Sequence, residues 1–215
     1  MEDDKMKEER TSTASPAKSP DSFLLFGRYN LGVEVNDAGL KKVISLKPVV
    51  LPKSSGRFSK QRLGRAKVDI VERLITHLLV PGHRGKKHLR TSKLSSGRYS
   101  TTFKVVYNAF DKLDKEGKNP VEVLVRAIEN SAPKEEVMTM LIAGQRIAKQ
   151  VDTSPMRRLD LALRWIAQGT FQASFSGKKA DAALHDVLIG ASQNQDSSFP
   201  ISKRIDTERQ AASSR

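Results

Sequence analysis

Positively charged side chains are the residues of this sequence whose types and spacing are best suited to chemistry. Between residues 53 and 67 the chain carries six lysines and arginines and no acid, interspersed with glycine, serine and one phenylalanine. Lysine and arginine neutralise phosphates, and arginine adds a planar set of donors that fits phosphate oxygens. A separate pair of arginines, Arg157 and Arg158, lies just after Pro155 at a predicted helix start, where acids are normally favoured.

The positive charge of the chain is concentrated in one segment. Residues 1–40 carry 5 cations and 8 acids, residues 41–104 carry 17 and 2, and residues 105–215 carry 16 and 14, within a formal net charge of +14. A segment so poor in acids repels itself unless a polyanion neutralises it. We therefore favour a nucleic-acid-binding surface over the alternative, a charged face that contacts only water.

Other kinds of chemistry find little support in the sequence. The chain has no cysteine, which excludes disulfides, thiolate zinc sites and cysteine nucleophiles. His83 and His88 share a lysine-rich loop without acids in ligand spacing, and His77 falls on a predicted helix near its apolar stripe. The run GHRGKK, residues 82–87, lacks the strand, the helix and the following Ser or Thr of a phosphate-binding loop. We therefore expect that the protein is not an enzyme and that it binds neither a metal ion nor a cofactor.

The amino-terminal part of the chain has no regular pattern. Residues 1–20 are rich in Ser, Thr, Pro and mixed charges and are expected to form a disordered tail. Residues 21–66 contain apolar clusters without a sustained helical period, followed by the basic run, and are expected to form an extended basic arm. The sequence shows no signal peptide and no run of membrane-spanning length, so we expect a soluble, cytoplasmic protein without membrane contact.

Residues 67–215 are dominated by helical periodicity. Apolar residues at helical spacing predict helices over 68–79, 99–113, 120–128, 155–167 and 180–188, and a polar helix follows at the carboxyl terminus. Asn119 and Ser154 are suited to cap two of these helices, each with proline at the first helical position. The predicted fold is mainly α, a bundle of about six helices.

Residues 136–151 depart from the helical pattern. Two β-favouring runs flank Ala143-Gly144 and predict a projecting β-hairpin with its turn near Gly144, supported by the bundle or by a ligand. Arg146 and Lys149 are three residues apart, so on a regular strand their side chains should point to opposite faces of the hairpin. Both could then contact a nucleic acid only if it wraps around the hairpin or if a bulge turns one of them. The alternative for the apolar hairpin residues is packing against a neighbouring protein.

Three long stretches of the sequence resemble a known family. GRFSKQRLGRAKVDIVERLI, NPVEVLVRAIENSAP and VDTSPMRRLDLALRWIA resemble the universal ribosomal protein seven family of the small subunit, in its archaeal branch, and the resemblance runs from about Phe26 to Arg215. It implies a six-helix bundle with a β-hairpin that binds the 3′ major domain of small-subunit rRNA directly and nucleates assembly of the head. It also implies a place near the tRNA exit site and the mRNA path, beside other head proteins and the platform protein of the eleventh family.

The resemblance also indicates which regions touch RNA. The family's RNA-binding regions correspond here to Lys53–Lys67, to Arg157 with Arg158, and to Ile142–Lys149. A phosphate beside the arginine pair would contribute about 1.5–3 kcal/mol per charge-assisted contact, more than the helix-dipole penalty of about 0.3–1 kcal/mol. The alternative is a solvated pair neutralised by Asp152 or Asp160. The archaeal family usually has Gly-Gly at the hairpin turn, where this chain has Ala143-Gly144.

From the charge and the resemblance together, we expect RNA contacts from cations of the arm, the basic loop of residues 83–98, the hairpin and several helix starts. These residues are Lys53, Arg57, Lys60, Arg62, Arg65, Lys67, Arg73, Arg84, Lys86, Lys87, Arg90, Arg98, Arg146, Lys149, Arg157, Arg158, Lys178 and Lys179. A DNA-binding helix-turn-helix regulator is the first rival, but it would need a recognition helix, whereas this charge is spread over arm and loops. An RNA-modifying enzyme is the second, and it lacks a recognisable cofactor or catalytic constellation.

Overall fold

A computed structural model describes residues 24–81, 83–84, 87–88 and 97–214. In this part of the chain six α-helices follow one another: α1 (Ile70–Leu78), α2 (Tyr99–Lys115), α3 (Pro120–Ser131), α4 (Pro155–Ser174), α5 (Ala180–Ser192) and α6 (Phe199–Ser213). One long hairpin, β3 (Glu135–Ile142) and β4 (Gln145–Asp152), separates α3 from α4. The predicted fold class, a bundle of about six helices with one hairpin, is confirmed. The tail expected at residues 1–20 lies outside the described residues.

The helices begin where side chains and prolines favour a start. The Asn119 side chain accepts a hydrogen bond from the Val121 amide at 3.1 Å, and Pro120 is the first residue of α3, as predicted. Asp69 caps α1 in the same way, accepting from the Val71 amide at 3.0 Å. Ser154 is the N-cap of α4 in extended conformation, with Pro155 following it. These local signals account for the agreement between predicted and observed helix starts.

The core of the bundle forms where the apolar faces of the helices meet. The largest fully buried side chains include Leu74 of α1, Phe110 of α2, Leu124 and Ile128 of α3, and Leu163 of α4. α2 buries one apolar face and exposes its other side, whereas most residues of α1 and α3 are buried, so these two helices lie inside the bundle.

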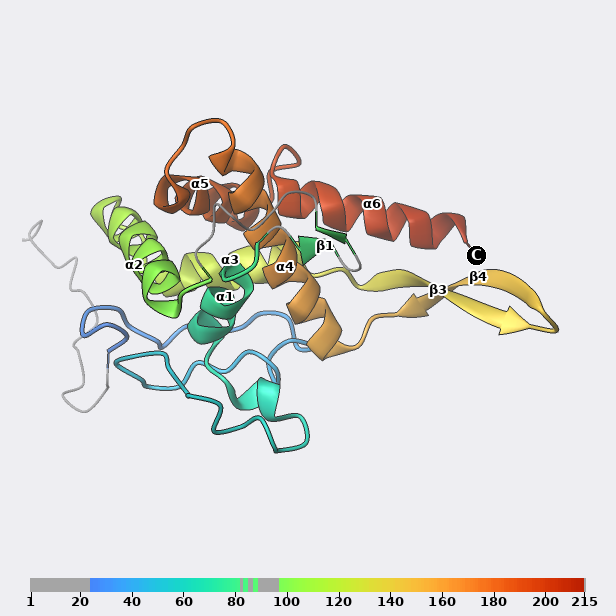
Figure 1. The fold of residues 1–215 in the computed structure, drawn as a ribbon, viewed down its shortest axis with the longest axis horizontal. Helices are drawn as coiled ribbons and strands as arrows, with labels where there is room; N and C mark the ends of the chain where they lie inside the picture. The colour runs from blue at the N-terminus through green and yellow to red at the C-terminus, as the bar shows by residue number, and fades with distance from the viewer. Residues whose placement is uncertain (1–23, 82, 85–86, 89–96, 215) are drawn as a thin grey trace, which may run out of the picture.

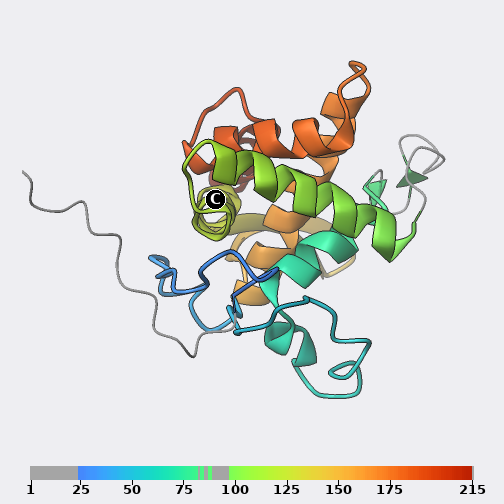
Figure 2. The same cartoon turned by 90° about the vertical axis from the view of Figure 1, so that its left-hand side faces the viewer.

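Residues 24–67 form an irregular layer along one side of the bundle (Figure 1, Figure 2). The layer contains turns, one isolated bridge between Leu25 and Tyr29, and a short 3-10 helix, η1 (Gly64–Lys67). Its first half packs against the bundle, with Leu25 and Leu40 fully buried in the core cluster. Only the second half has the exposed, cation-rich character that the sequence indicates.

The hairpin projects from the bundle, with α6 beside its base (Figure 1). Its ladder runs without a bulge from Glu135 opposite Asp152 to Ile142 opposite Gln145. Both turn residues have positive φ, 49° at Ala143 and 80° at Gly144, as a two-residue type I′ turn requires. The amide of Lys134 donates to Glu208 of α6 at 3.1 Å, which fixes the base of the hairpin. The predicted hairpin, its turn and its support by the bundle are therefore confirmed.

The segment between α1 and α2 contains a feature that the sequence did not indicate. A two-residue antiparallel pair, β1 (His83–Arg84) and β2 (Lys87–His88), forms where only a basic loop was expected. Such a short pair has no periodicity that a sequence pattern could reveal. None of the described helices combines the length and the apolar character needed to cross a membrane.

Candidate nucleic-acid interface

The strongest candidate for a binding surface is the acid-free segment of residues 41–67, which we call the basic segment. It contains nine lysines and arginines and no acid. All nine residues are exposed, and eight of them form no salt bridge with any described residue; the exception is Arg65, which pairs with Asp160. The basic segment therefore presents cations to the solvent without carboxylates to neutralise them, which is the electrostatic requirement for binding a polyanion.

The loop of residues 54–65, which carries four of these cations, is held in place at both ends. At its start the Glu72 carboxylate accepts hydrogen bonds from the Ser54 amide at 2.9 Å and the Ser54 hydroxyl at 2.8 Å. At its end Gly64 lies so close to the carbonyl oxygen of Phe58 that a Cβ atom would stand 2.0 Å from it. A glycine is therefore required there. Leu63, with φ of 54°, adopts a left-handed conformation just before it.

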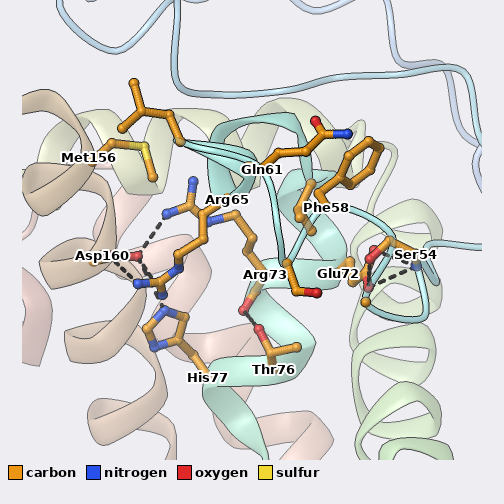
Figure 3. Close-up of a pocket in the computed structure, with 15 residues that line it drawn as sticks. Ser54, Phe58, Gln61, Arg65, Glu72, Arg73, Thr76, His77, Met156 and Asp160 are labelled. Atoms are coloured by element: carbon orange, nitrogen blue, oxygen red, sulfur yellow. Dashed lines mark hydrogen bonds and ion pairs between the residues drawn. The ribbon is translucent and has the colours of Figure 1, made fainter.

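A partly buried charge cluster joins the basic segment to the bundle. Asp160 of α4 accepts from Arg73 of α1 at 2.7 Å, pairs with Arg65 of η1 at 3.2 Å, and has His77 Nε2 at 3.7 Å (Figure 3). Burial raises the pKa of Asp160, but hydrogen bonding with His77 and Arg73 and the charge of Arg65 outweigh it and hold this pKa at about 2. The carboxylate is thus ionised at neutral pH and fixes Arg65 against α4.

The arginine pair at the start of α4 meets carboxylates of the protein itself. Arg158 is 8% exposed, pairs with Asp37 at 2.5 Å, and donates from Nε to the carbonyl oxygen of Pro133 at 3.1 Å. This guanidinium lowers the pKa of Asp37. Arg157 pairs with Glu136 of β3 at 2.5 Å, and its side chain stays 56% exposed.

The environment of this pair differs from the expectation that phosphate neutralises it. The sequence also offered Asp152 and Asp160 as acids that could do so, but the carboxylates in place are Asp37 and Glu136. Both are distant in sequence from α4, so no local pattern could identify them. RNA contact by Arg157 stays a prediction, whereas Arg158 and Arg73, which is 4% exposed, have little surface to offer a phosphate.

The remaining predicted residues fall on separate parts of the molecule. Arg146 and Lys149 are exposed on β4, and without a bulge in the ladder they belong to opposite faces, as predicted. Lys178 pairs with Asp186 at 2.7 Å, and Lys179 is the N-cap of α5, away from the hairpin (Figure 1). Arg98 precedes α2 and is exposed. Arg84 and Lys87 belong to the β1–β2 pair, and Lys86 and Arg90 lie outside the described residues.

Three further cations belong with the basic segment although they were not among the predicted RNA contacts. Lys41, Lys42 and Lys47 are exposed and form no salt bridge with a described residue. The signal that could have identified them was present, because the first cation of the acid-free run is Lys41 and not Lys53. All three belong to the irregular layer of residues 24–67 (Figure 1), as do the predicted cations from Lys53 to Lys67.

Comparison with known proteins agrees with the resemblance noted in the sequence. Residues 40–215 match the family described as Ribosomal protein S7p/S5e. The chain is 41% identical over 194 residues to the small ribosomal subunit protein uS7 of Nanoarchaeum equitans, covering 89% of this chain and 98% of that protein. It is 40% identical to the proteins of the same name from Thermoplasma volcanium and Cenarchaeum symbiosum, covering 89% and 90% of this chain and 100% and 98% of theirs.

These matches cover most of the chain and nearly the whole length of the three relatives. They cover the basic segment from residue 40 onward, all six helices and the hairpin. The relatives are archaeal in each case, as the resemblance implied, and the family consists of structural, non-enzymatic proteins of the ribosome. The chain therefore belongs to the ribosomal protein S7p/S5e family.

Proposed function

We propose that the protein is a constituent of the head of the small ribosomal subunit and binds the 3′ major domain of its rRNA directly through the basic segment. The observation that carries this proposal is the set of nine exposed cations in residues 41–67, eight of them without a carboxylate partner among the described residues. Each phosphate that such a cation neutralises releases counterions, which supplies much of the binding free energy.

The shape of the molecule supports recognition of folded RNA. The cations lie on turns and loops held against a rigid bundle, with no recognition helix that presents base-reading side chains among them. Double-stranded RNA is bound mainly through phosphates and 2′-hydroxyl groups, since its deep major groove is closed to side chains. We infer that the basic segment recognises the geometry of RNA helices and their junctions, with little reading of base sequence.

The hairpin offers a second contact region. It extends away from the bundle and exposes Arg146 and Lys149 together with the apolar side chains of Met138, Leu141 and Ile147. A mixed surface of this kind suits contacts with RNA and protein at once. We propose that through it the protein borders the tRNA exit site and the mRNA path and meets the platform protein of the eleventh family, while the bundle nucleates head assembly with other head proteins.

A competition experiment tests the central part of this proposal. The full chain is incubated with a labelled RNA of the 3′ major domain at fixed salt, and unlabelled competitors are added. We expect the same RNA to compete at least tenfold better than random duplex DNA of equal length. Equal competition by the duplex would favour a DNA-binding protein, and co-sedimentation with small subunits after a high-salt wash provides an independent check.

A further inference from the structure

A groove of about 650 Å³ opens between the loop of residues 54–65, α1 and the first turns of α4 (Figure 3). Phe58, Leu63 and Met156 supply its apolar lining. Leu63 is 68% exposed, an unusual position for a leucine that also adopts a left-handed backbone conformation. The volume falls within the range of about 300–1,000 Å³ that is typical of small-ligand sites, which combine apolar walls with a few fixed polar groups.

The polar groups of the groove are balanced in charge. Two arginines, Arg65 and Arg73, line it together with two carboxylates, Asp160 and Glu72. Asp160 pairs with both arginines, and Glu72 accepts a hydrogen bond from Ser54. Because two arginines are offset by two carboxylates, the hollow has no net attraction for a phosphate, which suits an uncharged planar group.

The rim of the groove has the opposite character. Three cations of the same loop are exposed and do not belong to the lining: Arg57, Lys60 and Arg62. Along the loop, lining residues thus alternate with rim cations. A neutral heterocycle in the hollow and phosphates on the rim would satisfy both parts of this arrangement.

We propose that the groove receives one unstacked nucleotide of the bound RNA, with the base in the hollow and the flanking phosphates on the cationic rim. This site rests on the RNA-binding function proposed above. Proteins that bind single-stranded nucleic acid stack bases on aromatic rings and guanidinium planes, and Phe58 and Arg65 offer both here. The basic segment would then hold its RNA at a position where one base leaves the helical stack, in addition to binding phosphates.

Filling the hollow without changing charge separates this site from the general attraction of the rim. Ser59 is exposed and lines the groove, so Ser59→Trp would occupy it. The matched control is Ser213→Trp, which adds the same side chain at the exposed last turn of α6. With RNA of the 3′ major domain, we expect Ser59→Trp to weaken binding by roughly tenfold with an unchanged salt dependence. We expect the control to stay within about twofold of the unmodified chain.

Photo-cross-linking identifies the residues that contact the RNA in the unmodified chain, so this second test needs no variant. RNA of the 3′ major domain carrying 4-thiouridine or 6-thioguanosine is bound, irradiated and mapped by mass spectrometry. We expect one nucleotide to cross-link to Phe58, Leu63 or Met156. Binding with cross-links outside the groove only, or equal affinity of Ser59→Trp and Ser213→Trp where both fold, overturns the nucleotide site and leaves the proposed function intact. Absence of binding by the unmodified chain overturns that function and this site with it.

Discussion

The cations of the bundle and those of the basic segment have different partners. Between residues 105 and 214 the chain carries 15 lysines and arginines, and eight of them pair with carboxylates of the protein. In the basic segment only Arg65 of nine does so. Because exposed pairs contribute little to folding, pairing in the bundle mainly neutralises its surface. The unpaired cations of the basic segment stay available for an external anion.

The two regions meet at the Asp160 cluster, where buried Arg73 and partly buried Asp160 hold exposed Arg65 in place. Arg73 is 4% exposed and reaches across to α4, whereas Arg65 approaches the same carboxylate from the basic segment with its side chain 67% exposed. One carboxylate, that of Asp160, thus stabilises the bundle and positions the loop of residues 54–65. Substitutions in the Asp160 cluster should therefore change the stability of the fold, whereas substitutions of the exposed cations should change RNA binding.

The largest expected effect is on folding. Asp160→Asn removes the carboxylate that faces buried Arg73 and should lower the free energy of unfolding by about 3 kcal/mol, because a buried charge is left uncompensated. Urea denaturation measures this loss. The control is Asp181→Asn, which breaks the more exposed pair with Lys112 and should cost about 0–1 kcal/mol. Equal losses in the two variants would show that the Asp160 cluster has no special role in stability.

The same carboxylate should give the chain a distinctive acid sensitivity. The folded-state pKa of Asp160 is about 2, below its ordinary value of 3.8, so the stabilisation is complete above pH 3.8 and is lost as the pH falls through 2. The shift corresponds to about 2 kcal/mol. Stability of the unmodified chain and of Asp160→Asn, compared between about pH 6 and pH 2, should converge at the acid end. A difference that stays constant over this range would contradict the assignment.

Neutralising the rim cations of the loop of residues 54–65 should weaken RNA binding and leave the stability of the fold nearly unchanged. We expect Lys60→Gln combined with Arg62→Gln to weaken binding to RNA of the 3′ major domain by about tenfold, or 1.4 kcal/mol. The slope of log K against log salt should flatten by about 0.7–0.9 for each phosphate that the variant no longer neutralises. Lys112→Gln combined with Lys203→Gln removes two paired cations of the bundle and serves as control. Identical slopes in both double variants would mean that the rim is merely solvated.

A second acid in this region should behave in the opposite sense to Asp160. Burial raises the pKa of Asp69 to about 6, so its ionised form destabilises the folded state at neutral pH, and this penalty falls as the pH drops through 6. Asp69→Asn retains a side-chain oxygen that can cap α1. We expect the variant to be about 1 kcal/mol more stable at pH 8 and to lose this advantage near pH 4. Chemical denaturation at both pH values provides the comparison.

The smallest expected effect lies at the hairpin turn. Ala143 has φ of 49°, which costs a non-glycine residue about 1 kcal/mol, whereas glycine adopts this conformation freely. Ala143→Gly should slow hydrogen exchange of the β3–β4 amides by a few-fold, because the gain in turn conformation exceeds the added freedom of the unfolded chain. Exchange in α3, which lies in the core, should not change. Faster exchange in the hairpin would show that the alanine turn is not strained.

The parts of the fold that the sequence predicts are those determined by local residues. Asn119 with Pro120 and Ser154 with Pro155 mark helix starts, and Ala143-Gly144 marks the turn, because neighbouring residues decide each of these features. The charge of the basic segment is likewise a property of composition. The helix starts and the hairpin therefore agree with the structure to within a few residues, whereas α4 continues to Ser174, seven residues past its predicted end.

The parts that the sequence does not predict depend on contacts between distant residues. The partner of Arg158 is Asp37, 121 positions away, and that of Arg73 is Asp160, 87 positions away. No spacing rule connects such pairs, so both arginines look like RNA contacts in the sequence although the fold buries them. The groove beside Phe58 is also invisible in the sequence, because α4 supplies one wall and lies far along the chain from residues 54–77, which supply the rest.

The most direct test of the central claim is the salt dependence of RNA binding by the unmodified chain and by a variant in which Arg57, Lys60 and Arg62 are all replaced by glutamine. If the basic segment neutralises rRNA phosphates, the slope of log K against log salt for RNA of the 3′ major domain should become less steep by about 2 to 3. The melting temperature should stay nearly constant, since these three residues are exposed. An unchanged slope, with both proteins folded, would contradict the account.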